Sequence, residues 1–511
     1  MQGLISYSSR FIQHTLLVIT CFFITSCMVG PNFKSPDAPT VTSYNESKLP
    51  SKSVVIKHAG KAGPAQIYVY NRDIPAEWWH LFKSPEIDEL VKTGMMNSPN
   101  LASAQAALKQ AQEALYAQIG NSMFPALNAG LSGERQRFSG ASIGSKLSGV
   151  FNLFNASVNV SYTLDIFGGA RREIESLQAQ VDYQQFQLIA AYLTLTSNIV
   201  TTSITVAELE EQIDATKKLI AAEEGQLEII RKQYHLGGVA DTNVLQQQTL
   251  VEQARATLPP LEQSLSQSKH ALSVLVGNFP NQPLPTIHLS KLTLPTQLPV
   301  SLPSKLVRQR PDVRASEALL HSASAQIGVA TANLFPQFNI TGNYGFTSTI
   351  PSSLFSGSSK VWSIANQITQ PIFHGGALFA ARRQAIDAYD QAAAQYRQTL
   401  LQAFQNVADS LRAIDTGSRT FKEQKSAEIA ARDALTIITK QYHDGGIAYL
   451  NLLNAQQQYQ QTRIASVQSQ AARYTNTAAL FQALGGGWWN REIATCSDPI
   501  NPNRVSMICP S

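Results

Sequence analysis

The chain has 511 residues, of which only 15% are charged, and 40 Lys and Arg against 35 Asp and Glu leave a net charge of +5. The charged fraction lies well below the ~25% of ordinary soluble domains, although 44% of the residues are apolar, so uncharged polar residues rather than disorder fill the deficit. This composition argues against a charged cytosolic surface, a polytopic helical membrane protein and a nucleic-acid-binding protein, which needs a strong basic excess.

The first 26 residues predict a signal peptide. They hold one basic residue, Arg10, and then an apolar run from Leu16 to Ile24 that is too short to be trusted as a membrane-spanning helix. The run ends in Thr and Ser before Cys27 and resembles a bacterial lipobox, in which this cysteine is acylated and becomes the first residue of the mature chain. The alternative is an ordinary signal peptide with an incidental cysteine. Met28, rather than Asp, follows Cys27, which fits outer-membrane sorting in enteric-type bacteria.

The rest of the chain contains a duplication. Residues Lys232–Ala240 recur as Lys440–Ala448 at an offset of 208 residues, and Phe124-Pro125 recurs as Phe335-Pro336. Echoes in the same order at nearly one offset indicate a duplicated unit. We therefore expect an N-terminal extended segment at 27–83, a first repeat at 84–277, a linker at 278–304, a second repeat at 305–485 and a C-terminal tail at 486–511.

Each repeat is predicted to open with a helix, after Pro99 or Pro311, and to continue with strands at about 127–166 or 337–371. Apolar and polar residues alternate in these strands, so one face is apolar and the other polar. The clearest apolar series comprises Ala156, Val158, Val160, Tyr162, Leu164 and Ile166. Gly/Ser-rich segments at 139–149 and 351–359 divide the strands, so each repeat supplies one β-hairpin.

Long helices are expected after the hairpins, at about 169–277 and 375–485. No proline occurs from Ala126 to Leu258, and in the second repeat apolar residues step by three and four, as in a coiled-coil seam. That seam comprises Ile386, Tyr389, Ala393, Tyr396, Leu400, Phe404, Val407, Leu411 and Ile414. The pairs Gly237-Gly238 and Gly445-Gly446 supply the reversals into the return helices. Prolines throughout 278–304 favour a linker over a long helix there.

Two cysteines lie in the Pro/Asn-rich tail, Cys496 and Cys509. Cys21 would leave with the signal peptide and Cys27 would carry lipid, so these two remain. An exported protein meets an oxidising compartment, which makes a disulfide between them the default expectation. A metal site is the weaker alternative, because no His or second Cys pair lies nearby at ligand spacing.

Four alternating strands cannot close a barrel, and an open sheet edge facing lipid would leave backbone groups unpaired. If these strands meet lipid, several chains must pool them: two chains would give eight strands and three would give twelve. The long helices would then form a tube continuous with the barrel, for which uncharged polar side chains suit a water-filled lining. The alternative is that the hairpins cap a soluble coiled-coil rod.

Motifs across nearly the whole mature chain resemble those of TolC-like outer-membrane factors, and specifically of the lipoprotein branch typified by NodT and OprM. The matching residues are Cys27–Phe33, Trp78-Trp79, Phe82, Leu90, Asn100-Leu101, Ala254–Glu262, Leu302-Pro303, Arg310–Arg314, Gly445–Leu450 and Ala483–Trp488. The resemblance implies a mainly α fold with a membrane β-barrel contribution. Each duplicated unit would supply long coiled-coil helices and one β-hairpin to a homotrimer with a twelve-stranded β-barrel and an α-helical barrel.

The resemblance also implies a function: the exit duct of a tripartite efflux system in the outer membrane of a Gram-negative bacterium. Its partners would be outer-membrane lipid, a periplasmic adaptor and an inner-membrane pump of the resistance-nodulation-division class. The adaptor would contact the tips at Gly237, Gly238, Gly445 and Gly446. The alternatives are the duct of a type I protein secretion system and a lipid-anchored coiled-coil adaptor without a pore.

Acidic residues near the tips are typical of the family, where they constrict the lumen. Asp241 and Asp444 are the candidates for such an aperture, and ordinary helix-end or turn chemistry is the alternative for both. Asn454 stands where many relatives carry Asp, so one expected ring of carboxylates is missing from the sequence.

The sequence contains no catalytic or cofactor-binding motif in the context that its chemistry requires. Residues Gly140–Gly144 fit the Gly-x-Ser-x-Gly pattern of hydrolases, but that motif needs a strand-turn-helix context and here lies in a predicted hairpin loop. Phosphate-loop, His-Glu-x-x-His and Cys-x-x-Cys motifs do not occur in the sequence. We therefore predict a protein that is not an enzyme and needs no cofactor.

Overall fold

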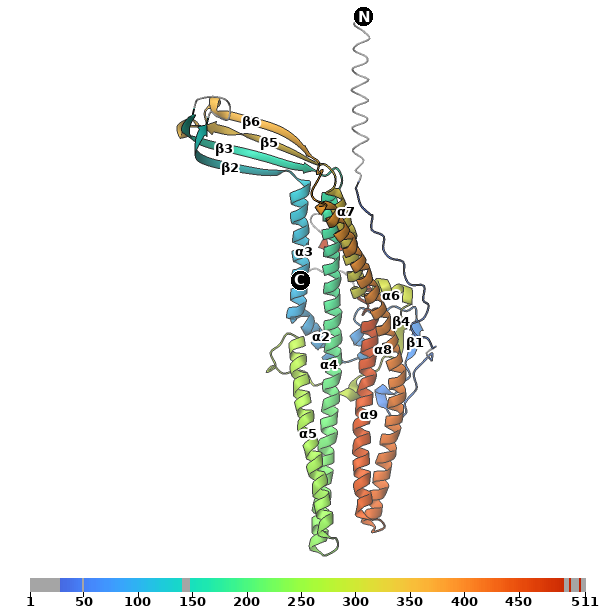
Figure 1. Cartoon of the computed structure of the whole chain (residues 1–511). Helices are drawn as coiled ribbons and strands as arrows, with labels where there is room; N and C mark the ends of the chain where they lie inside the picture. The colour runs from blue at the N-terminus through green and yellow to red at the C-terminus, as the bar shows by residue number, and fades with distance from the viewer. Residues whose placement is uncertain (1–27, 48–49, 140–147, 491–495, 498–504, 507–511) are drawn as a thin grey trace. The chain divides into compact units, whose positions relative to one another are not determined.

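Figure 1 shows the computed structural model, which describes residues 28–47, 50–139, 148–490, 496–497 and 505–506. The predicted signal peptide, Cys27 and Cys509 lie outside these residues. The chain divides into two compact units. The first comprises Met1–Pro36, Ala107–Gln185 and Ala315–Arg397, and the second Asp37–Ala106, Phe186–Arg314 and Gln398–Ser511.

The first unit contains one antiparallel sheet of four strands. Its strands are β2 (Ala126–Ser139), β3 (Ser148–Leu164), β5 (Gln337–Ser348) and β6 (Lys360–Thr369), in the order β2-β3-β5-β6. The two predicted hairpins therefore lie side by side, joined through the pairing of β3 with β5 (Figure 1). This is the strand content that the alternating pattern predicted, with the short helical turns Pro351–Ser353 and Gly357–Ser359 between β5 and β6.

A strap of residues that follows Cys27 is fixed to the first unit by a buried arginine. Arg172 is 1% exposed, and its guanidinium donates to the carbonyl oxygens of Val29 at 3.1 Å and Gly30 at 3.3 Å and to Asn32 Oδ1 at 2.8 Å. Gly30 has φ +90°, and a Cβ on it would lie 2.4 Å from Gly328 Cα, so no larger residue fits this close approach.

Four helices pass through the boundaries between the units: α3 (Pro99–Met123), α4 (Gly169–His235), α7 (Pro311–Ala332) and α8 (Ala377–His443). Both α4 and α8 have 67 residues, a length of about 100 Å at 1.5 Å per residue. The return helices α5 (Asp241–Leu275) and α9 (Tyr449–Ala483) have 35 residues each. The duplication seen in the sequence is thus repeated in the lengths of the helices.

In the second unit, α4 pairs with α5 and α8 pairs with α9 as two helical hairpins (Figure 1). The α8 seam predicted from the three-and-four spacing is confirmed there, since Val407, Leu411 and Ile414 are all at most 2% exposed. Helix α5 continues through Pro259 and Pro260 without a break. Proline normally interrupts a helix interior because it lacks the amide donor, but these two prolines lie within the helices expected at about 169–277, and the helix is continuous through them.

The remaining elements of the second unit are short strands and helices. The N-terminal segment supplies β1 (Ile67–Tyr70), which pairs in parallel with β4 (Gln297–Val300) of the predicted linker. Two short helices, α2 (Pro85–Asn97) and α6 (Pro303–Gln309), begin with proline at their first turn, where its missing donor costs nothing. Arg473 of α9 is 2% exposed and donates to the carbonyl oxygens of Ala62 and Pro64.

Within the described residues, one helix is long and apolar enough to cross a membrane by length and composition, namely α4. Half of its most apolar window is buried inside the chain.

Candidate functional site

The four-stranded sheet has one apolar and one polar face. The register places Leu127 of β2 opposite Val160 of β3, and Val158 of β3 opposite Tyr344 of β5. Since paired residues share a face, the apolar side chains align across all four strands. They are Leu127, Leu131, Phe154, Ala156, Val158, Val160, Tyr162, Leu164, Phe338, Ile340, Tyr344, Phe346, Trp362, Ile364 and Ile368. Leu131 is 77% and Trp362 74% exposed, so this chain does not cover its own apolar face.

The opposite face carries hydrogen-bonded polar side chains. Asn343 Nδ2 donates to Asn159 Oδ1 at 2.5 Å, and Thr163 Oγ1 donates to Asn339 Oδ1 at 2.7 Å. These pairs cross from β3 to β5, where cross-strand neighbours come within reach. A surface of this kind is suited to water, whereas the other face is suited to lipid.

The two outer strands of this sheet, β2 and β6, are each paired on one side only among the described residues. Each therefore presents a row of backbone donors and acceptors along its free edge. In lipid, such groups cost several kcal/mol each unless another strand pairs with them. The sheet is incomplete as a membrane element in a single chain.

The predicted tips at the glycine pairs are helix-terminating turns of one type. Gly237 and Gly445 both have φ +75°, and the amide of the next glycine bonds five residues back, Gly238 to the Gln233 carbonyl at 2.8 Å and Gly446 to the Gln441 carbonyl at 2.9 Å. This is the Schellman arrangement, in which one residue adopts the left-handed conformation. Glycine is favoured at that position because it has no Cβ to clash. The two tips therefore end α4 and α8 in the same way.

The two aspartates predicted near the tips lie on different sides of their turns. Asp241 is the first residue of α5, where its charge favours the helix N-terminus, whereas Asp444 precedes the turn glycine at the end of α8. Both side chains are exposed, and the repeat places Tyr449, not Asp444, at the position equivalent to Asp241. The structure does not bring these two carboxylates to equivalent places.

A mixed apolar and polar contact joins the two helical hairpins just above their tips. Ile230 of α4 packs with Tyr449, Leu452 and Leu453 of α9, and residues of α5 and α8 pack around them. Tyr449 donates its hydroxyl hydrogen to Gln247 Oε1, and Gln247 Nε2 donates to Glu223 Oε2 at 2.5 Å. Gln247 is fully buried and Glu223 is 3% exposed. We call Glu223, Gln247 and Tyr449 the tip link.

Burial sets the chemistry of the tip link. It raises the pKa of the Glu223 carboxyl, although the hydrogen bond from Gln247 lowers it in part. Burial likewise raises the pKa of the Tyr449 hydroxyl. Both effects favour neutral groups, so the link is a hydrogen-bonded contact between helices rather than an ion pair.

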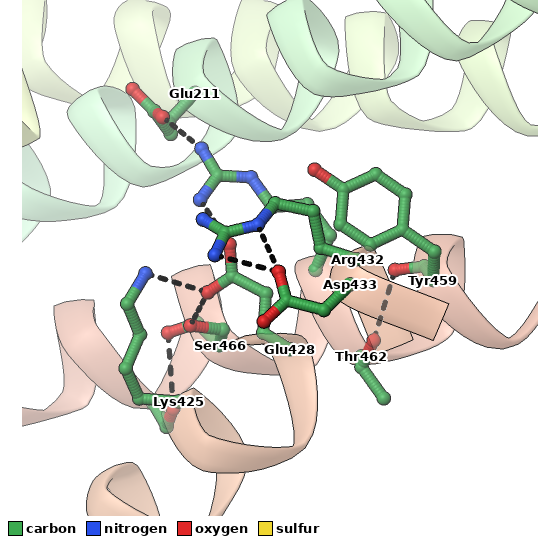
Figure 2. A network of polar contacts seen from close by, with 10 residues as sticks. Glu211, Lys425, Glu428, Arg432, Asp433, Tyr459, Thr462 and Ser466 are labelled. Carbon is green, nitrogen blue, oxygen red and sulfur yellow. Dashed lines mark hydrogen bonds and ion pairs between the residues drawn. The ribbon is translucent and has the colours of Figure 1, made fainter. Parts of the chain in front are cut away.

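A charged network joins the same hairpins farther along the helices (Figure 2). Arg463 of α9 donates to Glu428 Oε1 of α8 at 2.9 Å and to Glu211 Oε1 of α4 at 2.7 Å. Lys425 and Ser466 donate to the other oxygen of Glu428 at 2.7 and 2.6 Å. Burial alone would raise the pKa of Glu428, but the hydrogen bonds from Lys425 and Ser466 and the charges of Lys425 and Arg463 hold it below its usual range.

Sequence reasoning missed the tip link and the Arg463 network. Their members come from helices that are distant in sequence, Tyr449 from Gln247 by 202 residues and Arg463 from Glu211 by 252. The sequence held one signal for these contacts: the long helices contain charged residues, although few residues of the chain are charged. Among the described residues, no group of three or more His, Cys, Asp or Glu could hold a metal ion.

Comparison with known proteins assigns this architecture. The model of one family, described as outer membrane efflux protein, matches residues 90–278 and 302–486. The chain belongs to the outer membrane efflux protein family. Two relatives are the toluene efflux pump outer membrane protein TtgC of Pseudomonas putida, 28% identical over 93% of this chain and 96% of that protein, and the pyoverdine export outer membrane protein OpmQ of Pseudomonas aeruginosa, 29% identical over 81% and 87%.

The fold is shared with a solved channel. The structure of the Campylobacter jejuni CmeC outer membrane channel matches this chain with a TM-score of 0.81 at 22% sequence identity. The match includes 91% of this chain and 96% of CmeC. The efflux protein described here is therefore located in the outer membrane and has the TolC-like channel fold of long helices and a sheet, as the sequence motifs implied.

Proposed function

We propose that three copies of this chain form the exit duct of a tripartite efflux system. The duct would passively conduct small molecules from an inner-membrane pump of the resistance-nodulation-division class, through a periplasmic adaptor, across the outer membrane. In this proposal 84–277 and 305–485 are the two structural repeats of one protomer. The export of toluene by TtgC and of pyoverdine by OpmQ supports small molecules as the cargo.

The two-faced sheet with open edges carries this proposal. Its apolar face is exposed, its polar face suits water, and β2 and β6 lack partners on one side among the described residues. Antiparallel pairing of β6 with β2 of the next copy would continue the alternation around a closed barrel. Closure satisfies the edge groups in lipid and places the polar face around the lumen. Three copies, the number typical of the resembled family, give twelve strands.

The helical hairpins supply the periplasmic part of the duct. In this proposal the tips at Gly237-Gly238 and Gly445-Gly446 contact the adaptor. The duct opens when one hairpin moves away from the other, which breaks the tip link and the Arg463 network in turn. The exposed Asp241 and Asp444 would add negative charge around the aperture.

Acylation of Cys27 would anchor each copy to the membrane, and a disulfide between Cys496 and Cys509 would close the C-terminal tail. Because transport is driven by the pump, the duct needs no catalytic group and no cofactor. A Cys27→Ser substitution should abolish metabolic labelling with radioactive palmitate, and unchanged labelling would refute the lipid assignment.

Planar bilayer recording tests the duct itself. Purified protein should give stepwise conductance that rises when the contacts near the tips are weakened. Absence of conductance even from such variants would contradict the duct and favour the adaptor without a pore.

Crosslinking separates efflux from protein secretion. A photoreactive residue at Gly446 should capture the adaptor of an efflux pump in living cells, and the same residue at exposed Glu113 of α3 serves as the control. Capture of the adaptor of a type I secretion system instead would replace the efflux proposal.

A further inference from the structure

Charge in the four-stranded sheet has an unusual distribution. The strands contain four charged residues, Glu134, Arg135 and Arg137 on β2 and Lys360 on β6. All four lie in the halves of their strands next to the connecting loops, away from α3 and α4. A membrane sheet needs no charge for its stability, so this grouping invites a functional explanation.

The three cations share the apolar face, and the single acid does not. Leu131, Ala156, Phe346 and Lys360 form one row across β2, β3, β5 and β6, which places Lys360 on the apolar face. Arg135 and Arg137 follow Leu131 at intervals of two along β2 and therefore lie on that face as well. Glu134 lies on the polar face. The charged residues at the loop end of the apolar face are thus all cationic, and Arg135 and Arg137 lie opposite the uncharged Asn152 and Val150 of β3.

Aromatic side chains lie next to these cations. Trp362 follows Lys360 by two residues, about 7 Å along β6 toward its helix end, and pairs with Tyr344. Phe346 contacts Tyr344 and Phe355 with ring centroids 6.4 and 5.4 Å apart. Aromatic girdles mark the membrane–water interface of outer-membrane barrels. Arg135, Arg137 and Lys360 are exposed, and in a barrel that spans the membrane they would lie near the lipid headgroups.

We propose that Arg135 and Arg137 of one copy and Lys360 of the next form a binding site for the phosphate groups of lipid A in the outer leaflet. This inference rests on the proposed function, since β2 and β6 meet only when copies close a barrel whose helices point into the periplasm. The loop end of the sheet then faces the outer leaflet. Its diphosphorylated glycolipid offers two anionic groups, which guanidinium groups bind with charge-assisted hydrogen bonds.

Native mass spectrometry of the purified full-length protein tests the site, with diphosphoryl lipid A as the probe. The R135Q/R137Q/K360Q variant should bind it at least tenfold more weakly than wild type, and the charge-retaining R135K/R137K/K360R variant should bind within about threefold of wild type. Wild type should prefer diphosphoryl lipid A to monophosphoryl lipid A and to phosphatidylglycerol. The matched variant K52Q/K57Q/K109Q removes three exposed lysines elsewhere and should bind as wild type.

Equal loss in the matched variant, undiminished binding by the triple glutamine variant, or equal affinity for phosphatidylglycerol would each overturn the site. If the triple variant fails to assemble, the single variants decide, and each should lower the affinity at least twofold. Wild-type protein that conducts in bilayers but binds no lipid A overturns this inference alone. Protein that forms no pore overturns the proposed function.

Discussion

The buried hydroxyl of Tyr449 joins the two helical hairpins above their tips, where Tyr442 also donates to Gln233 Oε1 at 3.3 Å. The partner of Tyr449, Gln247, is fully buried, so loss of the donor leaves an amide oxygen without compensation, at a cost of about 1–3 kcal/mol. In the proposed opening these hairpins separate, so a weaker bond here should favour the open state.

We expect Tyr449→Phe to raise the open probability in planar bilayers several-fold, because it removes the hydrogen bond and preserves the ring packing. Tyr459→Phe on the same helix is the control, since Tyr459 lies outside the tip link. An unchanged open probability in the Tyr449 variant would mean that the tip link does not hold the duct closed.

The carboxyl of Glu208 on α4 provides a second prediction. Burial raises its pKa from 4.5 to about 7, and the hydrogen bond from Gln212 opposes this only in part. A raised carboxyl pKa contributes stability below the unfolded pKa that is lost as pH rises through the folded value. The wild-type protein should therefore lose about 1 kcal/mol of unfolding free energy between pH 4.5 and 7, a figure reduced for the partial exposure of the group.

Glu208→Gln should abolish this loss and make the protein more stable than wild type at pH 8. Denaturant unfolding at pH 5, 6, 7 and 8 measures the difference, with Glu113→Gln at an exposed position as the control. If the unfolding free energies of wild type and Glu208→Gln changed in parallel with pH, ionisation of Glu208 would not cost the folded state any stability.

At the scale of elements, the helix reversals depend on one glycine in each pair. Gly445 has φ +75°, which costs a residue with a side chain about 1 kcal/mol, whereas Gly446 is not in that conformation and a Cβ on it would meet Gln441 O at an ordinary 3.5 Å. Gly445→Ala should lower the unfolding midpoint and Gly446→Ala should not. Equal effects of the two substitutions would contradict the Schellman assignment.

The elements themselves followed closely from the sequence, for a physical reason. Alternation with period two and seams with period three to four record which side of a strand or helix is buried, and they require no knowledge of the partner. The pairing of β1 with β4 left no such trace, because strands of four residues carry too little pattern. The helices expected at about 169–277 included Pro259 and Pro260, and α5 is continuous through both.

At the scale of the whole molecule, the open edges β2 and β6 predict how copies meet. A cysteine at Leu127 on β2, combined with one at Ile364 or Ile368 on β6, should form disulfides between copies. The background would carry serine at Cys496 and Cys509. On denaturing gels the crosslinked species should stop at three chains.

Cysteines at Ser161 and Thr341 provide the matched control, because these residues pair within one chain through β3 and β5. They should close a disulfide without joining copies. A ladder that ends at two chains, or that continues beyond three, would contradict the trimer.

The sequence by itself determined the repeat, the two-faced strands, the long helices and the family. Each of these features appears in the sequence as a local periodicity or a motif, and can therefore be recognised without the tertiary structure. Only the tertiary structure decided which polar groups join the hairpins, that Arg172 holds the strap after Cys27, and that the cations of β2 and β6 share the apolar face. These facts depend on register and on contacts between residues up to 252 positions apart, which no local pattern records.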